Sequence, residues 1–132
     1  MDFQGIQDRL RAIEAPGIVE FDLPRAPDPA DKKDKGRAGV EAARIADFLE
    51  TCRDDVRLHF ELLVDLCGTD PSKDDEHLWV GYSLLSVKHR HRLAVKALVP
   101  KSAPELPSAT PVYRAAQWHE RETAEMYGIT FT

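Results

Sequence analysis

The sequence predicts an α+β fold, in which a small antiparallel or mixed sheet of three to four strands is covered by two to three helices. Two neighbouring segments, residues 78–87 and 92–99, alternate apolar and polar side chains as strands do, and a short basic link joins them as a hairpin. One helix is expected before this region in the sequence, at residues 40–54, and another after it, at residues 111–127. With 132 residues, the chain is long enough for a single domain with one modest core.

The first part of the chain, residues 1–39, is predicted to hold a helix, a short strand and a flexible loop. Its first apolar side chains have the spacing of one helix face: Phe3, Ile6, Leu10 and Ile13. Pro16-Gly17 ends this helix, and residues 18–23 form a short extended piece. Residues 24–39 are rich in Pro, Asp and Lys and contain too few apolar side chains to fold alone, so they are predicted to be a mobile loop.

The second part, residues 40–132, is predicted to form the α+β core of the same domain. Its first helix carries an apolar stripe of Ala42, Ile45, Phe48, Leu49 and Cys52. Residues 60–67 are an almost continuous apolar run, which predicts a strand buried on both faces. A polar turn at residues 70–76 leads into the hairpin. Two sets of side chains should share faces of its strands: Leu78, Val80, Tyr82 and Leu84 on the first, and Leu93, Val95, Ala97 and Val99 on the second.

The last helix is predicted from its two ends. Residues 100–110 contain three prolines and are not expected to be regular structure. Thr110 is a plausible N-cap, Pro111 suits the first helical position, and Gly128 suits the C-terminal cap.

Composition and charge exclude several classes of protein. A net charge of −5 argues against broad binding of nucleic acid, which needs an excess of Lys and Arg. No apolar run approaches the roughly 18 residues that span a bilayer, so membrane association is expected to be peripheral. The first residues lack the features of a signal peptide. Cys52 and Cys67 suit a reducing compartment, each as a small buried apolar residue, so the chain is expected to be intracellular.

Motifs that would support catalysis or cofactor binding are not found in the sequence. There is no Cys-x-x-Cys, and two cysteines cannot ligate an iron–sulfur cluster alone. Neither a Gly-x-Gly-x-x-Gly motif after a strand, nor a P-loop, nor a nucleophile elbow occurs. We therefore expect no catalytic residue, no metal ligand and no cofactor-binding residue in this chain.

The hairpin link contains the motif His89-Arg90-His91, which could bind a metal ion. No third ligand is apparent, however, and the surrounding basic residues repel a cation. A solvated basic turn is the favoured interpretation. Its positive charge could dock against an acidic partner or against lipid headgroups.

The helix at residues 111–127 carries the most informative charges. One alternative is a solvated face, in which Arg121 and Glu125 pair at i,i+4. The other is a docking surface formed by Glu120, Arg121 and Glu122. Because side chains at i and i+2 point to different sides of a helix, Glu120 and Glu122 cannot form one catalytic acid–base pair. His119 is read as structural rather than as a proton carrier.

Several dispersed motifs resemble one known family in order and spacing. They are Arg53-Asp54-Asp55, the run from Phe60 to Leu66, the run from Tyr82 to His89, the run from Val95 to Pro100, the run from Leu106 to Thr110, Ala115-Ala116-Gln117-Trp118, and the run from Glu120 to Ile129. From about Ile45 to its end, the chain is similar to the 30 kDa subunit (the C-subunit) of the proton-pumping NADH:quinone oxidoreductase, respiratory complex I.

This resemblance implies a scaffold subunit of the hydrophilic arm of an enzyme complex, with no cofactor of its own. NADH, flavin, iron–sulfur clusters and quinone would be bound by partner subunits. The subunit would brace the quinone-reducing module beside the hydrogenase-large-subunit-like partner and the partner with the terminal iron–sulfur cluster. It would lie peripherally at the cytoplasmic face of the inner (plasma) membrane, or on the matrix side if mitochondrial. The implied interface or signature residues are Trp118, Glu120, Arg121, Glu122, Glu125, Tyr127 and Gly128.

The chain also departs from the family pattern. Ala124 and Glu125 stand where the family signature commonly has an aromatic residue and an aspartate, and residues 28–36 are an atypical insertion. Family members usually continue past Phe131 with a Gly-His-Pro segment, further arginines and a tail, whereas this chain stops at Thr132. Two alternatives therefore stay open: the equivalent subunit of a complex I-related membrane-bound nickel–iron hydrogenase, and a free-standing protein-binding module.

Overall fold

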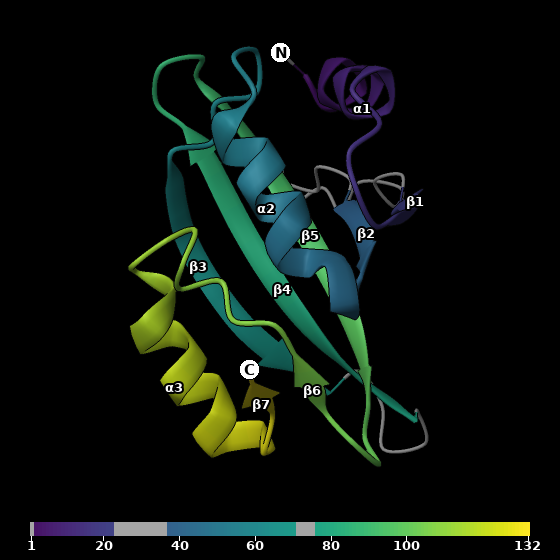
Figure 1. Cartoon of the computed structure of the whole chain (residues 1–132), viewed down its shortest axis with the longest axis vertical. Helices are drawn as coiled ribbons and strands as arrows, with labels where there is room; N and C mark the ends of the chain where they lie inside the picture. The colour runs from purple at the N-terminus through teal and green to yellow at the C-terminus, as the bar shows by residue number, and fades with distance from the viewer. Residues whose placement is uncertain (1, 23–36, 71–75) are drawn as a thin grey trace, which may run out of the picture.

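The computed structural model describes residues 2–22, 37–70 and 76–132, which form a five-stranded mixed sheet, a two-stranded sheet and three α-helices (Figure 1). In chain order, the elements of this described part are α1 (Phe3–Ala12), β1 (Ile18–Asp22), β2 (Arg37–Glu41), the short 3-10 helix η1 (Ala42–Arg44), α2 (Ile45–Asp54), β3 (Leu62–Thr69), β4 (His77–Ser86), β5 (His91–Pro100), β6 (Glu105–Leu106), α3 (Ala116–Tyr127) and β7 (Thr130–Phe131).

The large sheet has the strand order β1-β2-β5-β4-β3. Strands β4 and β5 form the predicted hairpin, paired from His77 with Pro100 to Ser86 with His91. Strand β2 runs parallel to β5, and the other neighbours are antiparallel. The predicted α+β class and mixed sheet are therefore confirmed. The sheet has five strands instead of three to four, because β1 and β2 both join it.

Two boundaries near the start of the core differ from the prediction. The expected loop over residues 24–39 gives way to strand at Arg37, and its earlier part, residues 24–36, lies outside the described residues. The helix expected from Val40 begins at Ile45, because Val40 is the last buried residue of β2 and η1 intervenes. The N-terminal helix and the short extended piece after it are confirmed as α1 and β1.

Strand β3 was expected to be buried on both faces, and this is wrong. It is an edge strand of the five-stranded sheet and pairs there with β4. Its side chains Leu62 and Val64 are about half exposed. The strand also continues through Gly68 to Thr69 instead of ending at that glycine. Most of the polar turn expected after it, residues 71–75, lies outside the described residues.

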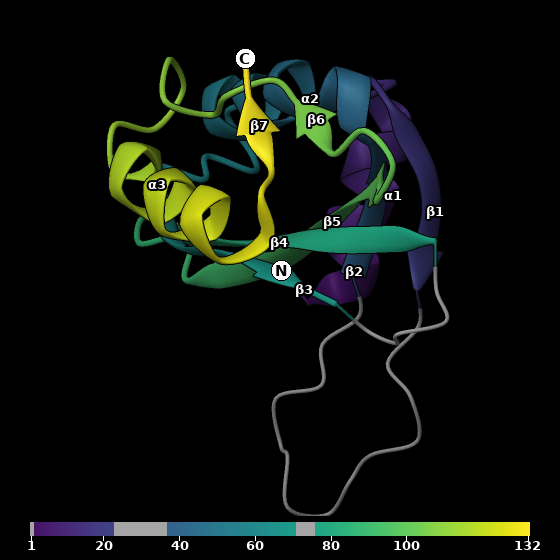
Figure 2. The same cartoon turned by 90° about the horizontal axis from the view of Figure 1, so that it is seen from below.

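The core lies between the sheet and the helices on one side of it. Figure 2 shows α2 and α3 on the same side of the sheet, together with β6 and β7. The alternating side chains of the hairpin point into this layer and are buried: Leu78, Val80, Tyr82 and Leu84 from β4, and Leu93, Val95, Ala97 and Val99 from β5. Helix α2 adds the buried side chains of Ile45, Phe48, Leu49 and Cys52. Among the helices that the structure describes, none has the length and apolar character needed to cross a membrane.

The final helix starts later than predicted. Residues 110–115 form turns, and α3 begins at Ala116, so Thr110 is not its N-cap. The Thr110 hydroxyl instead donates to the carboxylate of Glu120 at 3.2 Å. The segment before α3, expected to be irregular, contains the two-residue strand β6, which pairs with β7.

Candidate interaction site on the C-terminal helix

Helix α3 has one side against the molecule and one side open. Its buried residues are Ala116, Glu120 and Thr123, at the i, i+4, i+7 spacing of one helix face. Six residues of α3 are exposed, and we call five of them the outer face of α3: Trp118, Arg121, Glu122, Glu125 and Met126. The inner side packs on β3. The helix therefore presents a fixed charged and apolar surface at the edge of the sheet (Figure 1).

Glu120 holds the inner side of α3 to the segment that leads into it. Its carboxylate accepts hydrogen bonds from the hydroxyl of Ser108 at 2.7 Å and from the backbone N–H of Ala109 at 2.6 Å, in addition to the bond from the Thr110 hydroxyl. The side chain is only 6% exposed. A buried carboxylate is tolerated when several donors satisfy its oxygens, as here. Because its carboxylate is buried, Glu120 belongs to neither a solvated face nor a docking surface, and the docking surface expected from Glu120, Arg121 and Glu122 loses its first member.

Tyr127 and Gly128 fix the end of the helix. A Cβ atom placed on Gly68 of β3 would lie only 2.7 Å from the ring of Tyr127, so the helix approaches this strand closely. Gly128 has a φ of 67°, and its N–H donates to the Ala124 carbonyl at 2.9 Å. This confirms the predicted C-terminal cap, since glycine adopts the left-handed conformation without steric cost. The cap turns the chain into β7.

The outer face combines large apolar side chains with charges. Trp118 is 64% exposed and Met126 is 77% exposed. Between them, Arg121 Nε lies 3.8 Å from Glu125 Oε1, which confirms the expected i,i+4 pair. Such an exposed pair contributes little to stability. Beside this face, His119 Nδ1 lies 3.7 Å from Asp65 Oδ1 of β3.

The two histidines of the hairpin link are more structural than the sequence suggested. His91 is buried, with Nε2 at 2.6 Å from the Leu58 carbonyl, and His89 Nε2 lies 2.9 Å from the Val56 carbonyl. Burial lowers the pKa of His91, although the carbonyl of Leu58 opposes this effect. The interpretation as a fully solvated turn is therefore wrong for His91. A signal was present: His91 lies two residues before Leu93, so strand alternation places both on the buried side.

The cysteines differ from each other. Cys52 is buried in α2, as expected, and burial raises the pKa of its thiol. Cys67 was also expected to be buried, but it is exposed on the edge strand β3. Both thiols are free. Within residues 2–22, 37–70 and 76–132, no cluster of three or more His, Cys, Asp or Glu side chains is arranged to hold a metal ion.

The comparisons with known proteins agree on one family. A model of the family described as "Respiratory-chain NADH dehydrogenase, 30 Kd subunit" matches residues 38–132. The C-subunit of the NADH-quinone oxidoreductase of Acidithiobacillus ferrooxidans is 45% identical over 107 residues, which cover 74% of this chain and 52% of that protein. The C-subunit of the same enzyme in a Methylobacterium species is 39% identical over 129 residues, or 98% of this chain and 56% of that protein. The chain thus spans about half the length of these relatives.

Two solved structures share the fold. A trypsin-resistant fragment (1-134) of Nqo5 superposes with a TM-score of 0.65 at 25% identity, covering 99% of this chain and 96% of the fragment. A chain of the membrane-bound sulfane sulfur reductase, an archaeal respiratory membrane complex, superposes with a TM-score of 0.74 at 21% identity, covering 97% of this chain and 70% of that chain, and shows the fold alone. The family match over residues 38–132 and the relative at 45% identity show that the protein belongs to the family of the 30 kDa subunit of respiratory-chain NADH dehydrogenase.

Proposed function

We propose that this chain is a scaffold subunit of the hydrophilic arm of an NADH:quinone oxidoreductase, and that it braces the quinone-reducing module through the outer face of α3. Membership of the 30 kDa subunit family supports this assignment, as do the names of relatives at 39–45% identity. In this proposal the chain contributes surface shape and charge, and no side chain of its own takes part in a reaction step.

The observation that carries the proposal is the exposure of Trp118 and Met126 on a charged helix. Most of the surface of each side chain is in contact with water. Covering this apolar surface with a partner would lower the free energy. Tryptophan, methionine and arginine are enriched at protein interfaces, and tryptophan is a frequent centre of binding energy. The outer face brings all three residue types together, with Arg121 beside Glu125. A partner that covers this face would gain apolar contact area and would meet charges of both signs.

The way α3 is attached makes its outer face suitable for docking. Glu120 accepts three hydrogen bonds on the inner side, and Gly128 caps the end. The backbone that carries Trp118 and Met126 is therefore already ordered before a partner arrives. Ordering a segment on binding costs free energy, so a fixed helix binds more tightly than a mobile one with the same contacts.

The partners proposed for this face are the hydrogenase-large-subunit-like subunit and the subunit with the terminal iron–sulfur cluster. NADH, flavin, the clusters and quinone would be bound by partner subunits of the complex. The position that follows is peripheral, on the cytoplasmic side of the inner (plasma) membrane, or on the matrix side if the complex is mitochondrial. Charge pairs that lose water at such an interface would set the register of the subunits.

The test is recovery of partner subunits from native membranes by tagged chain. Wild type is compared with a variant carrying Trp118→Ala and Met126→Ala, and mass spectrometry identifies the proteins in each eluate. We expect wild type to recover quinone-reductase subunits and the variant to recover at least tenfold less, a loss of about 1.4 kcal/mol or more. The matched control carries Val19→Ala and Leu98→Ala, which also remove two exposed apolar side chains but lie on β1 and β5.

Three results would change the proposal. Equal recovery by wild type and the α3 variant would move the interface away from the outer face. Nickel–iron hydrogenase subunits in the eluate would assign the chain to that related complex. Recovery of no redox subunit by wild type would leave a free-standing binding module as the better function. Unchanged circular dichroism and melting temperature of each variant are required for any of these conclusions.

A further inference from the structure

A second surface lies at the turn of the β4–β5 hairpin, away from the part of β3 that α3 covers. Two turns meet there, at the top of Figure 1: the turn that joins α2 to β3, near residues 55–58, and the turn that joins β4 to β5, near residues 87–90. His89 Nε2 reaches the Val56 carbonyl at 2.9 Å, and His91 Nε2 reaches the Leu58 carbonyl at 2.6 Å. The carboxylate of Glu61 accepts the Val87 N–H. These bonds clamp the two turns into one rigid unit.

This unit exposes two apolar side chains and three cations, and we call it the basic tip: Val56, Arg57, Val87, Lys88 and Arg90. Val56 is 69% exposed and Val87 is 59% exposed. Within the described residues, the side chains of Arg57, Lys88 and Arg90 have no carboxylate partner. The basic tip therefore carries three uncompensated positive charges on a chain whose net charge is −5.

The acidic side chains nearby are already engaged. The Asp55 carboxylate pairs with Arg9 at 2.7 Å and accepts the backbone N–H of Leu58. Glu61 holds Val87, and Asp2 accepts the N–H of Gly5 as the N-cap of α1. These carboxylates stabilise the local structure and leave the cations of the basic tip free to pair with another molecule.

We propose that the basic tip docks against a protein surface that carries clustered carboxylates. Complementary charge accelerates association and fixes orientation, and a rigid site loses little entropy on binding. Two exposed valines between the cations would become buried in the same contact, where they add apolar area. This surface is separate from the outer face of α3, and the proposal extends the scaffold function to a second contact.

The chemistry of the tip favours carboxylates of a protein over lipid headgroups. Two of its three cations are arginines, whose planar guanidinium groups can donate two parallel hydrogen bonds to one carboxylate in a bidentate pair. Membrane-binding surfaces usually add tryptophan, phenylalanine or leucine to reach the acyl region, and the exposed apolar residues of the tip are valines only. Three cations alone would contribute only about 3 kcal/mol at an anionic membrane.

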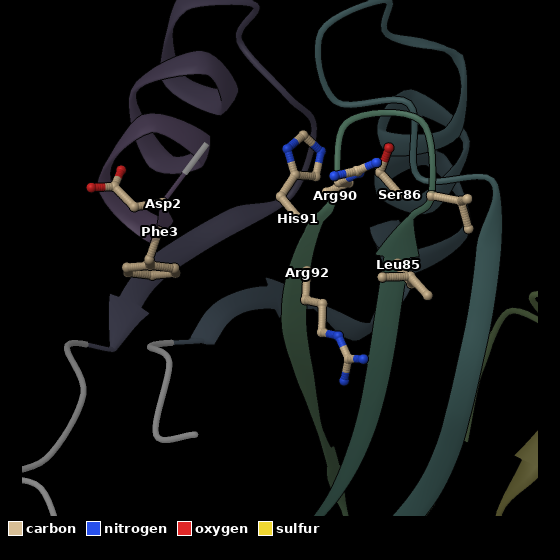
Figure 3. A pocket seen from close by; sticks show the side chains of 8 residues that line it. Asp2, Phe3, Leu85, Ser86, Arg90, His91 and Arg92 are labelled. Carbon is tan, nitrogen blue, oxygen red and sulfur yellow. The ribbon is translucent and has the colours of Figure 1, made fainter. Parts of the chain in front are cut away.

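A cleft beside the tip gives a protruding acidic side chain a place to enter. It has a volume of about 660 Å³ and lies between the start of α1 and the hairpin (Figure 3). Arg90 and Arg92 line it, and in Figure 3 the carboxylate of Asp2 points away from the hairpin. A carboxylate in this cleft would thus meet arginines.

Carbodiimide cross-linking of the native assembly tests this proposal directly, because the reagent joins a lysine amine to a carboxylate in contact with it. We expect an amide bond between Lys88 and an Asp or Glu of another protein, found by mass spectrometry of the digested assembly. Lys88→Arg keeps the charge but cannot form this product, so the cross-link should disappear while the assembly remains. A Lys88 bonded only within this chain, or not at all, would overturn the proposal.

Charge reversal supplies a second measurement. Lys88→Glu should weaken retention of the chain in the assembly by about tenfold at low ionic strength, with less effect at high salt. Arg114→Glu changes the charge equally at an exposed site outside the tip and is the matched control. Equal retention of both variants would also overturn the proposal. Sedimentation with vesicles of phosphatidylserine and phosphatidylcholine covers the lipid alternative: binding by wild type that Lys88→Glu abolishes would replace the protein partner with a membrane.

These results separate the two surfaces. If Lys88→Glu weakens assembly and the variant with Trp118→Ala and Met126→Ala does not, docking through the basic tip is supported and docking through the outer face of α3 is contradicted. The reverse pattern contradicts only docking through the basic tip.

Discussion

Tyr127 lies so close to Gly68 that a methyl group on Gly68 would be 2.7 Å from Cδ2 of the tyrosine ring. The same methyl group would be 3.0 Å from Cγ2 of Thr123. Real Cβ atoms require more room, so α3 and β3 can meet at this distance only because residue 68 has no side chain. The position of the outer face of α3 relative to the sheet therefore depends on one glycine.

Gly68→Ala should destabilise the protein by about 1–3 kcal/mol, because the added methyl group forces either Tyr127 or the helix to move. Chemical denaturation by urea, followed by circular dichroism, measures this change in the free energy of unfolding. If the strain acts through the tyrosine ring, the cost in a Tyr127→Leu background should be clearly smaller. An equal cost in both backgrounds would contradict this explanation.

Gly81→Ala is the control for Gly68→Ala. Gly81 lies opposite Cys67 in the neighbouring strand β4, and the nearest atom to an added Cβ would be 3.8 Å away, which is an ordinary contact. Alanine is favoured over glycine in a strand by about 0.5–1 kcal/mol. We therefore expect Gly81→Ala to be neutral or slightly stabilising.

Glu120→Ala should destabilise the protein by about 3 kcal/mol. The change removes the acceptor of three hydrogen bonds and leaves the Ala109 N–H buried without a partner. Glu120→Gln should cost less, about 1–2 kcal/mol, because the amide oxygen can still accept one N–H. Urea denaturation of the three proteins gives this order. Glu122→Ala, on the exposed side of the same helix, should stay within about 0.5 kcal/mol of wild type, and a comparable loss there would contradict the assignment.

The sequence predicted the hairpin well because its signal is local. Each residue of β4 and β5 alternates strictly between buried and less buried sides, and a short turn connects the strands. The C-terminal cap at Gly128 was predictable for a similar reason, since the left-handed conformation restricts the residue type. Both features depend on residues that are close together in the chain.

The features that were missed depend on partners far away in the chain. Strand β2 pairs in parallel with β5, more than fifty residues later, and its inward residues Ala38 and Val40 make only a short apolar pattern. Glu120 looked like a surface charge because its donors, at residues 108–110, come from a turn that was expected to cap the helix instead. A polarity pattern does not show that a charged side chain is satisfied by buried hydrogen bonds.

Asp55→Asn should lower stability by about 1.5–3 kcal/mol near neutral pH, and the loss should shrink in acid. Arg9 donates two hydrogen bonds to the Asp55 carboxylate and, with the N–H of Leu58, holds the pKa of that carboxyl below its usual value of 3.8. Since the folded state has the lower pKa, the contribution of Asp55 is fully present above 3.8 and is lost as the pH falls through the folded value.

The measurement for Asp55 is urea denaturation of wild type and variant at about pH 7 and about pH 3. Asp54→Asn is the control, since Asp54 pairs with Arg53 in an exposed position where solvent screens the charges. It should have little effect at either pH. An Asp55→Asn cost that is the same at both pH values would show that the carboxylate charge is not what stabilises the contact between α1 and the α2–β3 turn.

Tyr82→Phe should be neutral or stabilising, whereas Tyr113→Phe should be destabilising. Both phenols are buried, and burial raises the pKa of each hydroxyl. Tyr113 donates to the Phe60 carbonyl at 2.7 Å, so its loss leaves a buried acceptor unsatisfied and should cost about 1–2 kcal/mol. The Tyr82 hydroxyl has no hydrogen-bond partner among the described residues, so removing it relieves a desolvation cost of about 1 kcal/mol. Urea denaturation of both variants measures the difference. A destabilising Tyr82→Phe would mean that a buried water or a neighbouring group such as Glu120 satisfies this hydroxyl in solution.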